Sequence, residues 1–110
     1  MTNAAFSPEE VRRLLAEHRA RIDTIDLQLV ELLNRRAAAA AEIGRAKQAA
    51  GMAVYEPKRE DDVYHNVLAA NAGPLSGDAL KRIFERIIDE MRSLQRLRAD
   101  QDRKRAKGEA

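Results

Sequence analysis

The stretch from Glu9 to Ala50 contains no proline and a single glycine, Gly44. Proline and glycine are the residues that most often end or bend a helix, so this stretch predicts one uninterrupted helix. The helix would have about 43 residues and be roughly 65 Å long at 1.5 Å per residue. It would be far longer than the common helix of a globular protein.

The long helix has a start signal at its N-terminal end and a stop signal at its C-terminal end. Ser7 is an N-cap residue, Pro8 takes the first helical position, and Glu10 follows the serine by three residues, which completes a capping box. Gly51 is the residue at which we expect the helix to end.

Mostly apolar residues recur along this helix at alternating spacings of four and three, a near-heptad seam. The seam consists of Val11, Leu15, His18, Ile22, Ile25, Leu29, Leu32, Arg36, Ala39, Ile43, Ala46 and Ala50. Two shorter helices cannot cover so long a stripe, because some of its turns would project beyond them into water. A second copy of the chain is therefore expected to cover it.

Two shorter helices are expected in the remaining sequence. Pro57 follows the extended link "MAVYE" and opens a helix that runs to about Asn71. "NAGPLSGD" has the composition of a turn, after which Ser76 caps a third helix that we expect to end near Arg98.

These elements predict one all-α domain with a very long first helix. We assign it to residues 7–98, with a flexible N-terminus at 1–6 and a polar, disordered tail at 99–110.

Composition narrows the function classes. With 20 basic and 18 acidic residues the net charge is only +2, which gives no strong attraction to nucleic acid. The chain has no cysteine and two histidines far apart, so we expect neither a thiol nucleophile nor a metal site. No signal peptide and no run of about 18 apolar residues is present, so we expect a soluble, cytoplasmic protein without a membrane partner.

Five polar residues interrupt or border the apolar stripes: Arg36, Lys47, Arg59, Glu60 and Gln95. Each has an ordinary explanation: a snorkelling or paired arginine, a solvated lysine, an exposed charge pattern on the second helix, and a glutamine that reaches water. Arg36 and Lys47, however, are eleven residues apart and return to nearly the same azimuth about 16 Å along the helix. Two cations on one face are able to converge on one anion.

From about Val11 to Gln95, the sequence resembles the all-helical (type II) class of chorismate mutase. The resemblance is carried by the segments "HRARIDTIDLQLVELLNRRAAAAAEIGRAK", "AVYEPKRE" and "GPLSGDALKRIFERIIDEMRSLQ". Within them stand R-x-x-I-D-x-I-D, an arginine after the LL pair, G-x-x-K and P-x-R-E, which are specific in combination.

The resemblance implies a three-helix protomer that intertwines with a second copy, the long helices pairing antiparallel in a homodimer. The activity it implies is rearrangement of chorismate to prephenate without a cofactor. Arg36 and the partner subunit's Arg19 would bind the two carboxylates of the substrate, Lys47 and Gln95 its ether oxygen, and Glu60 its ring hydroxyl. Arg59 would support this charged network.

Two positions depart from the family pattern. Met91 stands where the family often has serine, and Glu56 where it often has aspartate, so substrate binding is expected to be weaker or rearranged. Helix geometry supports a shared site, because Arg19 and Arg36 are about 25 Å apart on one helix and point about 100° apart. One small dicarboxylate cannot reach both on the same helix.

Other functions remain open at this point. An isochorismate pyruvate lyase would share the fold and a similar set of cations. A mutase-like regulatory module would bind a larger shikimate-pathway enzyme and have little activity alone. Pure coiled-coil scaffolding is disfavoured by the cation Arg36 within the seam.

Overall fold

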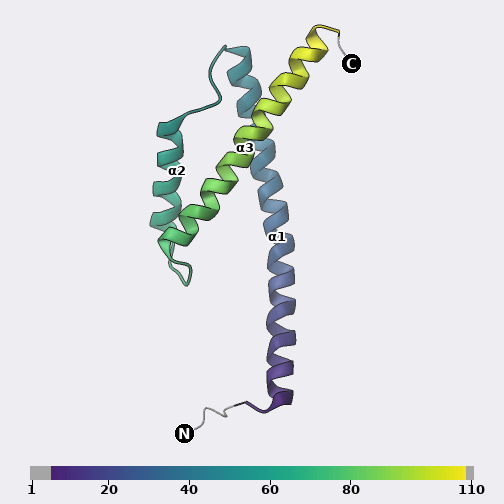
Figure 1. The fold of residues 1–110 in the computed structure, drawn as a ribbon, viewed down its shortest axis with the longest axis vertical. Coiled ribbons are helices and arrows are strands. Elements are labelled where there is room, and N and C mark those ends of the chain that lie inside the picture. Colours follow the sequence, from purple (N-terminus) through teal and green to yellow (C-terminus); the bar gives the residue numbers. More distant parts are fainter. Residues whose placement is uncertain (1–5, 109–110) are drawn as a thin grey trace. The chain divides into compact units, whose positions relative to one another are not determined.

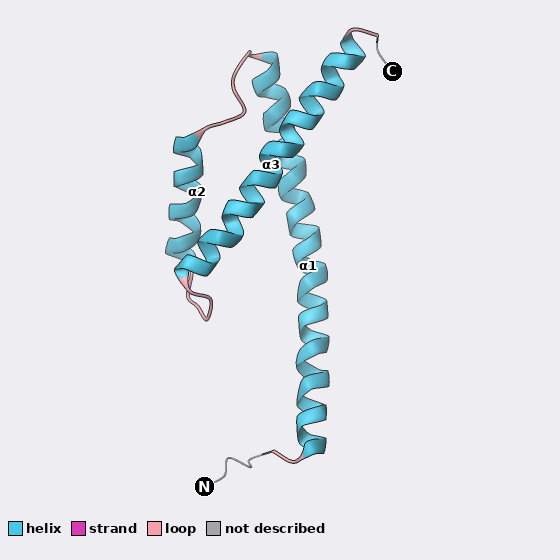
Figure 2. Cartoon of the chain, viewed as in Figure 1, coloured by secondary structure: helices cyan, strands magenta, loops and turns pink. Residues whose placement is uncertain are grey.

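The computed structural model describes residues 6–108 of the chain. Within this range the structure contains three helices and no strand: α1 (Pro8–Ala49), α2 (Pro57–Ala70) and α3 (Gly77–Ala106) (Figures 1 and 2). The expected all-α class is therefore confirmed. The expected division into domain and termini stays a prediction, and residues 1–5 lie outside the described part.

Helix α1 begins and ends at the expected signals. The Oγ of Ser7 accepts a hydrogen bond from the backbone N–H of Glu10 at 3.2 Å, as an N-cap serine does. At the other end Gly51 has a φ of +68°, which glycine adopts without steric cost. The N–H of Met52 then donates to the carbonyl of Lys47 at 2.7 Å, the 6→1 bond of a Schellman cap. The backbone therefore turns sharply at Gly51, just after α1 ends.

The turn before α3 is also built from local side-chain chemistry. The Oδ1 of Asn71 accepts from the N–H of Gly73 at 3.0 Å, and its Nδ2 donates to the carbonyl of Leu75 at 2.9 Å. Ser76 then caps α3, its Oγ accepting from the N–H of Ala79 at 3.1 Å. The predicted cap of the third helix is confirmed.

Helix α3 continues beyond its expected end. We expected it to stop near Arg98 because the apolar stripe stops there, but it runs to Ala106, so that expectation is wrong. Residues 99–106, which we had placed in a disordered tail, are helical in the structure. An ion pair between Arg103 and Asp100 supports this segment. Basic residues in the last turn also support it, because positive charge is favourable at the carboxyl end of the helix dipole. A helix supported in this way does not need a buried face.

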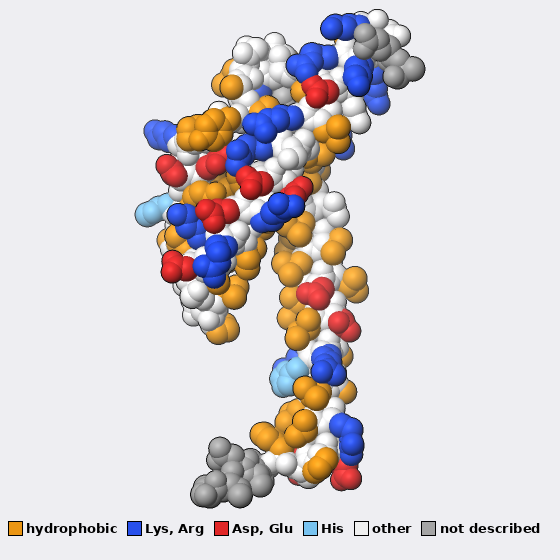
Figure 3. All heavy atoms as spheres, viewed as in Figure 1, with side chains coloured by type: hydrophobic (Ala, Val, Ile, Leu, Met, Phe, Trp, Pro, Cys, Tyr) orange, Lys and Arg blue, Asp and Glu red, His pale blue; other side chains and the backbone are white. Residues whose placement is uncertain are grey.

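The chain divides into two compact units, one ending at Arg36 and one beginning at Ala37. In the first unit the seam of α1 is exposed, and apolar side chains recur along its surface (Figure 3). The exposed large apolar residues of α1 in this unit are Val11, Leu15, Ile22, Ile25, Leu27, Leu29, Val30, Leu32 and Leu33. The first unit thus leaves a long apolar surface in contact with water.

The second unit contains the end of α1 together with α2 and α3. All residues classed as buried in the described range lie in this unit. Four of them are apolar (Ala40, Ala41, Val63 and Ile88), two are polar, Lys47 and Gln95, and the seventh is Gly44. A small core that contains a cation and an amide marks this unit as the place to look for a site.

The helices within residues 6–108 do not combine the length and the hydropathy that a membrane span requires. None of them is long and apolar enough to cross a bilayer.

Candidate active site

Lys47 is a buried cation in the last turn of α1. It is only 8% exposed, so the explanation of a solvated lysine is wrong. Its Nζ donates to the backbone carbonyl of Val54 at 3.1 Å and lies 2.5 Å from an Oε of Glu56. A buried ammonium is tolerated because these oxygens replace its water. The sharp turn after α1 brings the link back over the lysine and supplies both partners.

Glu56 is the carboxylate that compensates this charge. It stands at the N-cap of α2, but its side chain makes no cap hydrogen bond there. About half of it is exposed, 48% by surface, while its carboxylate contacts the buried lysine. The lysine is therefore held at the edge of the core, beneath a carboxylate that water can reach.

Gln95 brings a neutral amide to the same face of α1. It is 9% exposed, which excludes the explanation of a glutamine that reaches water. Its Nε2 donates to the backbone carbonyl of Ala40 at 2.7 Å. A Cβ added to Gly44 would lie 2.9 Å from the Cγ of Gln95, so the glycine makes room for this side chain. Ala40, Gly44 and Lys47 lie at i, i+4 and i+7, which places them on one face of the helix.

Glu60 forms an ion pair between α2 and α3. Its Oε2 lies 3.2 Å from the Nε of Arg92, and the two side chains are only 18% and 26% exposed. The Nε is buried and has no hydrogen-bond acceptor in the described structure, so this contact is electrostatic rather than a directed hydrogen bond. The explanation of Glu60 as part of an exposed intrahelical pattern is wrong.

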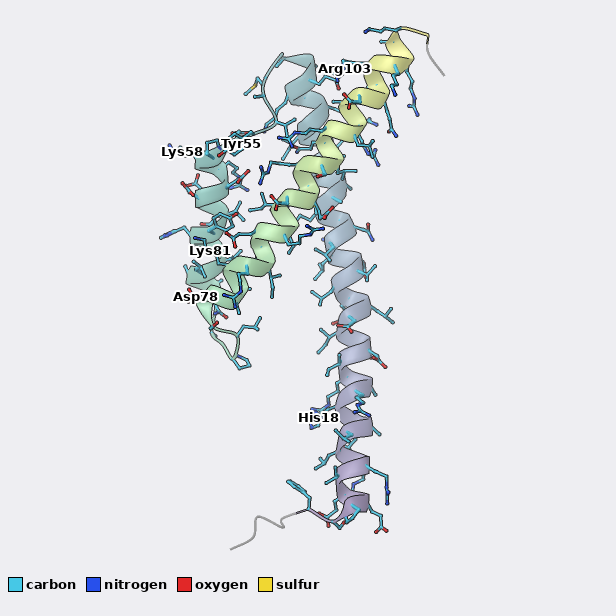
Figure 4. The ribbon with its side chains drawn as sticks, in the orientation of Figure 1. His18, Tyr55, Lys58, Asp78, Lys81 and Arg103 are labelled. Atoms are coloured by element: carbon cyan, nitrogen blue, oxygen red, sulfur yellow. The ribbon has the colours of Figure 1, made fainter. Side chains whose placement is uncertain are left out.

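Arg92 was missed by the sequence argument. Besides Glu60 it pairs with Asp89 at 2.5 Å, and its guanidinium carbon lies 5.6 Å from the ring centroid of Tyr55. Figure 4 shows Tyr55 in the link, close to Lys58 at the start of α2. One signal was present in the sequence: Arg92 follows Ile88 by four residues and therefore lies on the apolar stripe of α3.

The acidic residues of this cluster act on Tyr64. Burial, and then the charges of Glu60, Glu85 and Asp89, raise the pKa of the Tyr64 phenol above its ordinary 10.0. The guanidinium of Arg92 acts in the opposite direction and lowers that pKa. The pKa of Tyr64 thus depends first on burial and then on the balance of charge between these carboxylates and Arg92.

This arrangement suits the stabilisation of a negative charge that develops during a reaction. A buried ammonium and a buried amide lie at the same face of α1. The model of the family described as chorismate mutase type II matches residues 18–96 of the chain. The chain belongs to this family.

Curated relatives and solved structures agree with the family. The bifunctional chorismate mutase/prephenate dehydratase of Neisseria gonorrhoeae is 38% identical over 88 residues, which are 80% of this chain and 24% of the relative. The protein of the same description from Aquifex aeolicus is 35% identical over 86 residues, 74% of this chain and 24% of the relative. The chain thus spans about a quarter of the length of these relatives.

Among solved structures, form II of chorismate mutase from Thermus thermophilus is similar, with a TM-score of 0.73 at 27% identity. The match covers 74% of this chain and 93% of that one. Form I of the same protein gives a TM-score of 0.68 at 27% identity, over 70% of this chain and 96% of that one.

The remaining predicted residues of this chorismate mutase family member are distributed over both units. Arg59 is exposed in the first turn of α2, next to Glu60, and Met91 is half-buried on α3, next to Arg92. Arg19, exposed, and Arg36, half-buried, lie on α1 in the first unit. The structure of the second unit thus brings Lys47 together with Glu56 and sets Gln95 on the same face of α1. The functional assignments of all eight predicted site residues remain predictions.

Proposed function

We propose that this chain is an isomerase that rearranges chorismate to prephenate. The reaction is a Claisen rearrangement, a concerted shift of bonds within one molecule, which needs no nucleophile, proton transfer or cofactor. An enzyme accelerates it by holding a compact conformer and by stabilising the negative charge on the ether oxygen as its bond breaks. The observation that carries this proposal is the burial of Lys47 on the α1 face against which Gln95 packs.

The contacts of Lys47 fit a group that binds the ether oxygen. An ammonium has three N–H donors, of which one is directed to Val54 and another to Glu56. We assign the third donor to the ether oxygen of chorismate, with the amide of Gln95 as its neighbour. Because the lysine is already ordered by its two partners, little reorganisation is required when the charge develops.

The substrate carboxylates are assigned to arginines. A guanidinium forms two parallel hydrogen bonds to a carboxylate and stays charged, so two of them fix both ends of a dicarboxylate. We assign these contacts to Arg36 and to the partner subunit's Arg19. Glu60 accepts the ring hydroxyl and Arg59 supports the charged network, while Glu56 and Met91 line the site.

This assignment requires a homodimer. The exposed apolar seam of α1 in the first unit supports it, because a long apolar surface of this kind marks a protein–protein interaction site. We propose that the seams of two copies pair antiparallel, which would bring the partner subunit's Arg19 toward Arg36.

The decisive experiment follows the loss of chorismate by ultraviolet absorbance with the purified protein alone. Lys47→Ala and Arg36→Ala are expected to remain folded dimers and to lose about a hundredfold or more in turnover, by comparison with other preorganised donors. Lys58→Ala is the matched control, because Lys58 is exposed in the first turn of α2 and should not affect turnover. Near-normal turnover in the Lys47 or Arg36 variant would overturn the assigned roles.

The same assay separates the alternatives. Release of pyruvate from isochorismate, without turnover of chorismate, would identify a lyase instead. The relatives combine a chorismate mutase with a prephenate dehydratase, and this chain spans only a quarter of their length. A module that acts with a partner enzyme therefore remains an alternative. Low turnover that rises when a shikimate-pathway enzyme is added would identify such a module. The cytoplasmic location stays a prediction.

A further inference from the structure

Arg92 forms a polar cluster with Glu60, Asp89 and Tyr55, and it has no assigned part in the proposed reaction. It contacts groups from three segments: Glu60 on α2, Asp89 on its own helix α3, and the ring of Tyr55 in the link. An exposed arginine samples many rotamers, whereas this one is largely buried and constrained from three sides. Its guanidinium therefore stays in one place.

We propose that Arg92 is a positioning residue that orients the carboxylate of Glu60 for the hydroxyl group of the substrate. The proposal rests on the proposed function, in which Glu60 accepts that hydroxyl. Arg92 itself touches no substrate in this scheme and acts only through Glu60.

The geometry of the ion pair suits this task. An ionised carboxylate offers about four acceptor positions on its two oxygens. Because the Arg92 Nε approaches Oε2 of Glu60 without a directed hydrogen bond, the cation attracts the carboxylate but leaves its acceptor positions available. A bidentate pair would have occupied both oxygens and competed with the hydroxyl.

Charge balance supports the same conclusion. The charges of Glu60, Glu85 and Asp89 all raise the pKa of Tyr64, so three carboxylates lie within electrostatic range of one phenol and repel one another. Arg92 pairs with two of the three and offsets this repulsion. Without it, Glu60 would be free to rotate away from Asp89 and toward water.

A double-mutant cycle on chorismate turnover tests the proposal. Arg92→Met alone should lower kcat/KM by about ten- to a hundredfold, the range expected when a contact group is displaced. In the background of Glu60→Gln the same change should cost less than about twofold, because Arg92 then has no carboxylate to orient. Equal losses in both backgrounds would overturn the proposal and identify Arg92 as a purely structural link between α2 and α3.

Two further variants control for folding and for charge. Arg92→Lys keeps the positive charge and should retain turnover several-fold above that of Arg92→Met; if Arg92→Met does not fold, the cycle is run with Arg92→Lys. Arg86→Met removes an exposed arginine that pairs with Glu90 on α3 and should leave turnover unchanged. An equal loss in Arg86→Met would show that the effect is not specific to Arg92 and would contradict the proposal.

A readout independent of activity is the titration of Tyr64. In a Tyr55→Phe background, which keeps the ring beneath the guanidinium, Tyr64 is the remaining tyrosine of the two in the chain. Arg92→Met should raise the pKa of the Tyr64 phenol, which is measured by ultraviolet absorbance. An unchanged titration would place Arg92 outside the cluster and overturn the proposal. If the wild type does not convert chorismate, the proposed function fails and this inference fails with it; an active wild type with additive losses rejects the inference alone.

Discussion

The side-chain amide of Gln95 on α3 donates a 2.7 Å hydrogen bond to the backbone carbonyl of Ala40 on α1. This bond fixes the rotation of the glutamine, and Gly44, one turn further along α1, fixes how closely it approaches. Because Lys47 lies on the same face of α1, the contact sets the position of one proposed catalytic group relative to the other. Small changes at Gly44 should therefore be felt at the site.

Gly44→Ala is expected to lower turnover more than stability. The added Cβ would lie 2.9 Å from the Cγ of Gln95, so the glutamine must shift, and a small displacement of a positioned group costs roughly tenfold or more in rate. Alanine in a helix interior is favoured over glycine by about 1 kcal/mol, which offsets part of the strain in the folded state. Turnover and urea denaturation measure the two effects separately.

Gly77→Ala is the matched control for this change. At Gly77 the nearest atom to an added Cβ is a methyl carbon of Leu68 at 3.5 Å, an ordinary van der Waals contact. This variant should keep its activity. Full activity in Gly44→Ala as well would show that the close contact with Gln95 does not position the site.

Gln95 also determines the expected pH dependence. Its amide is uncharged at every ordinary pH, so activity should persist at pH 7 to 8 without an acidic optimum. In Gln95→Glu the new carboxyl donates a hydrogen bond only when it is protonated, and its ionised form would repel the developing charge on the ether oxygen. Turnover of that variant should rise as the pH falls. A wild-type rate that rises steeply only below about pH 5 would contradict the assignment.

The features predicted from sequence are those that depend on near neighbours in the chain. The cap of α1 at Ser7, the glycine end at Gly51 and the cap of α3 at Ser76 each involve groups a few residues apart, so their residue types suffice. The end of α3 was misplaced because an apolar stripe indicates burial, and helix 99–106 is stabilised without it.

The partners of the buried polar groups were not predictable in the same way. The motif G-x-x-K pointed to Lys47, but its contact with the carbonyl of Val54 depends on how the link returns over α1. The pairing of Glu60 with Arg92 joins two helices, and no periodicity within either helix specifies it. Spacing identifies which side chains face inward, whereas their partners follow from packing.

The raised pKa of Tyr64 predicts a loss of stability at alkaline pH. Burial and the surrounding carboxylates raise this pKa, so the folded state holds the phenol proton more tightly than the unfolded state does. The resulting stability is fully present below the ordinary pKa of 10.0 and is lost as the pH rises through the raised value. The free energy of unfolding should fall above about pH 10, and fall less in Tyr64→Phe. Urea denaturation of both proteins from about pH 8 to 11 measures the difference; parallel curves would refute it.

The seam of α1 predicts the effect of a charge on assembly. Leu29 is 49% exposed in the first unit and lies on the seam, whereas Leu27 is 72% exposed and lies about 200° around the helix from it. Burying a leucine contributes about 1.5–3 kcal/mol, and in a symmetric dimer each substitution acts twice. Leu29→Asp should therefore convert the proposed dimer to monomer at micromolar concentration and abolish turnover, because the partner subunit's Arg19, which we assign to the site, is lost. Leu27→Asp should leave both intact. Light scattering coupled to gel filtration gives the mass, and a Leu29→Asp protein that remains an active dimer would show that the seam is not the interface.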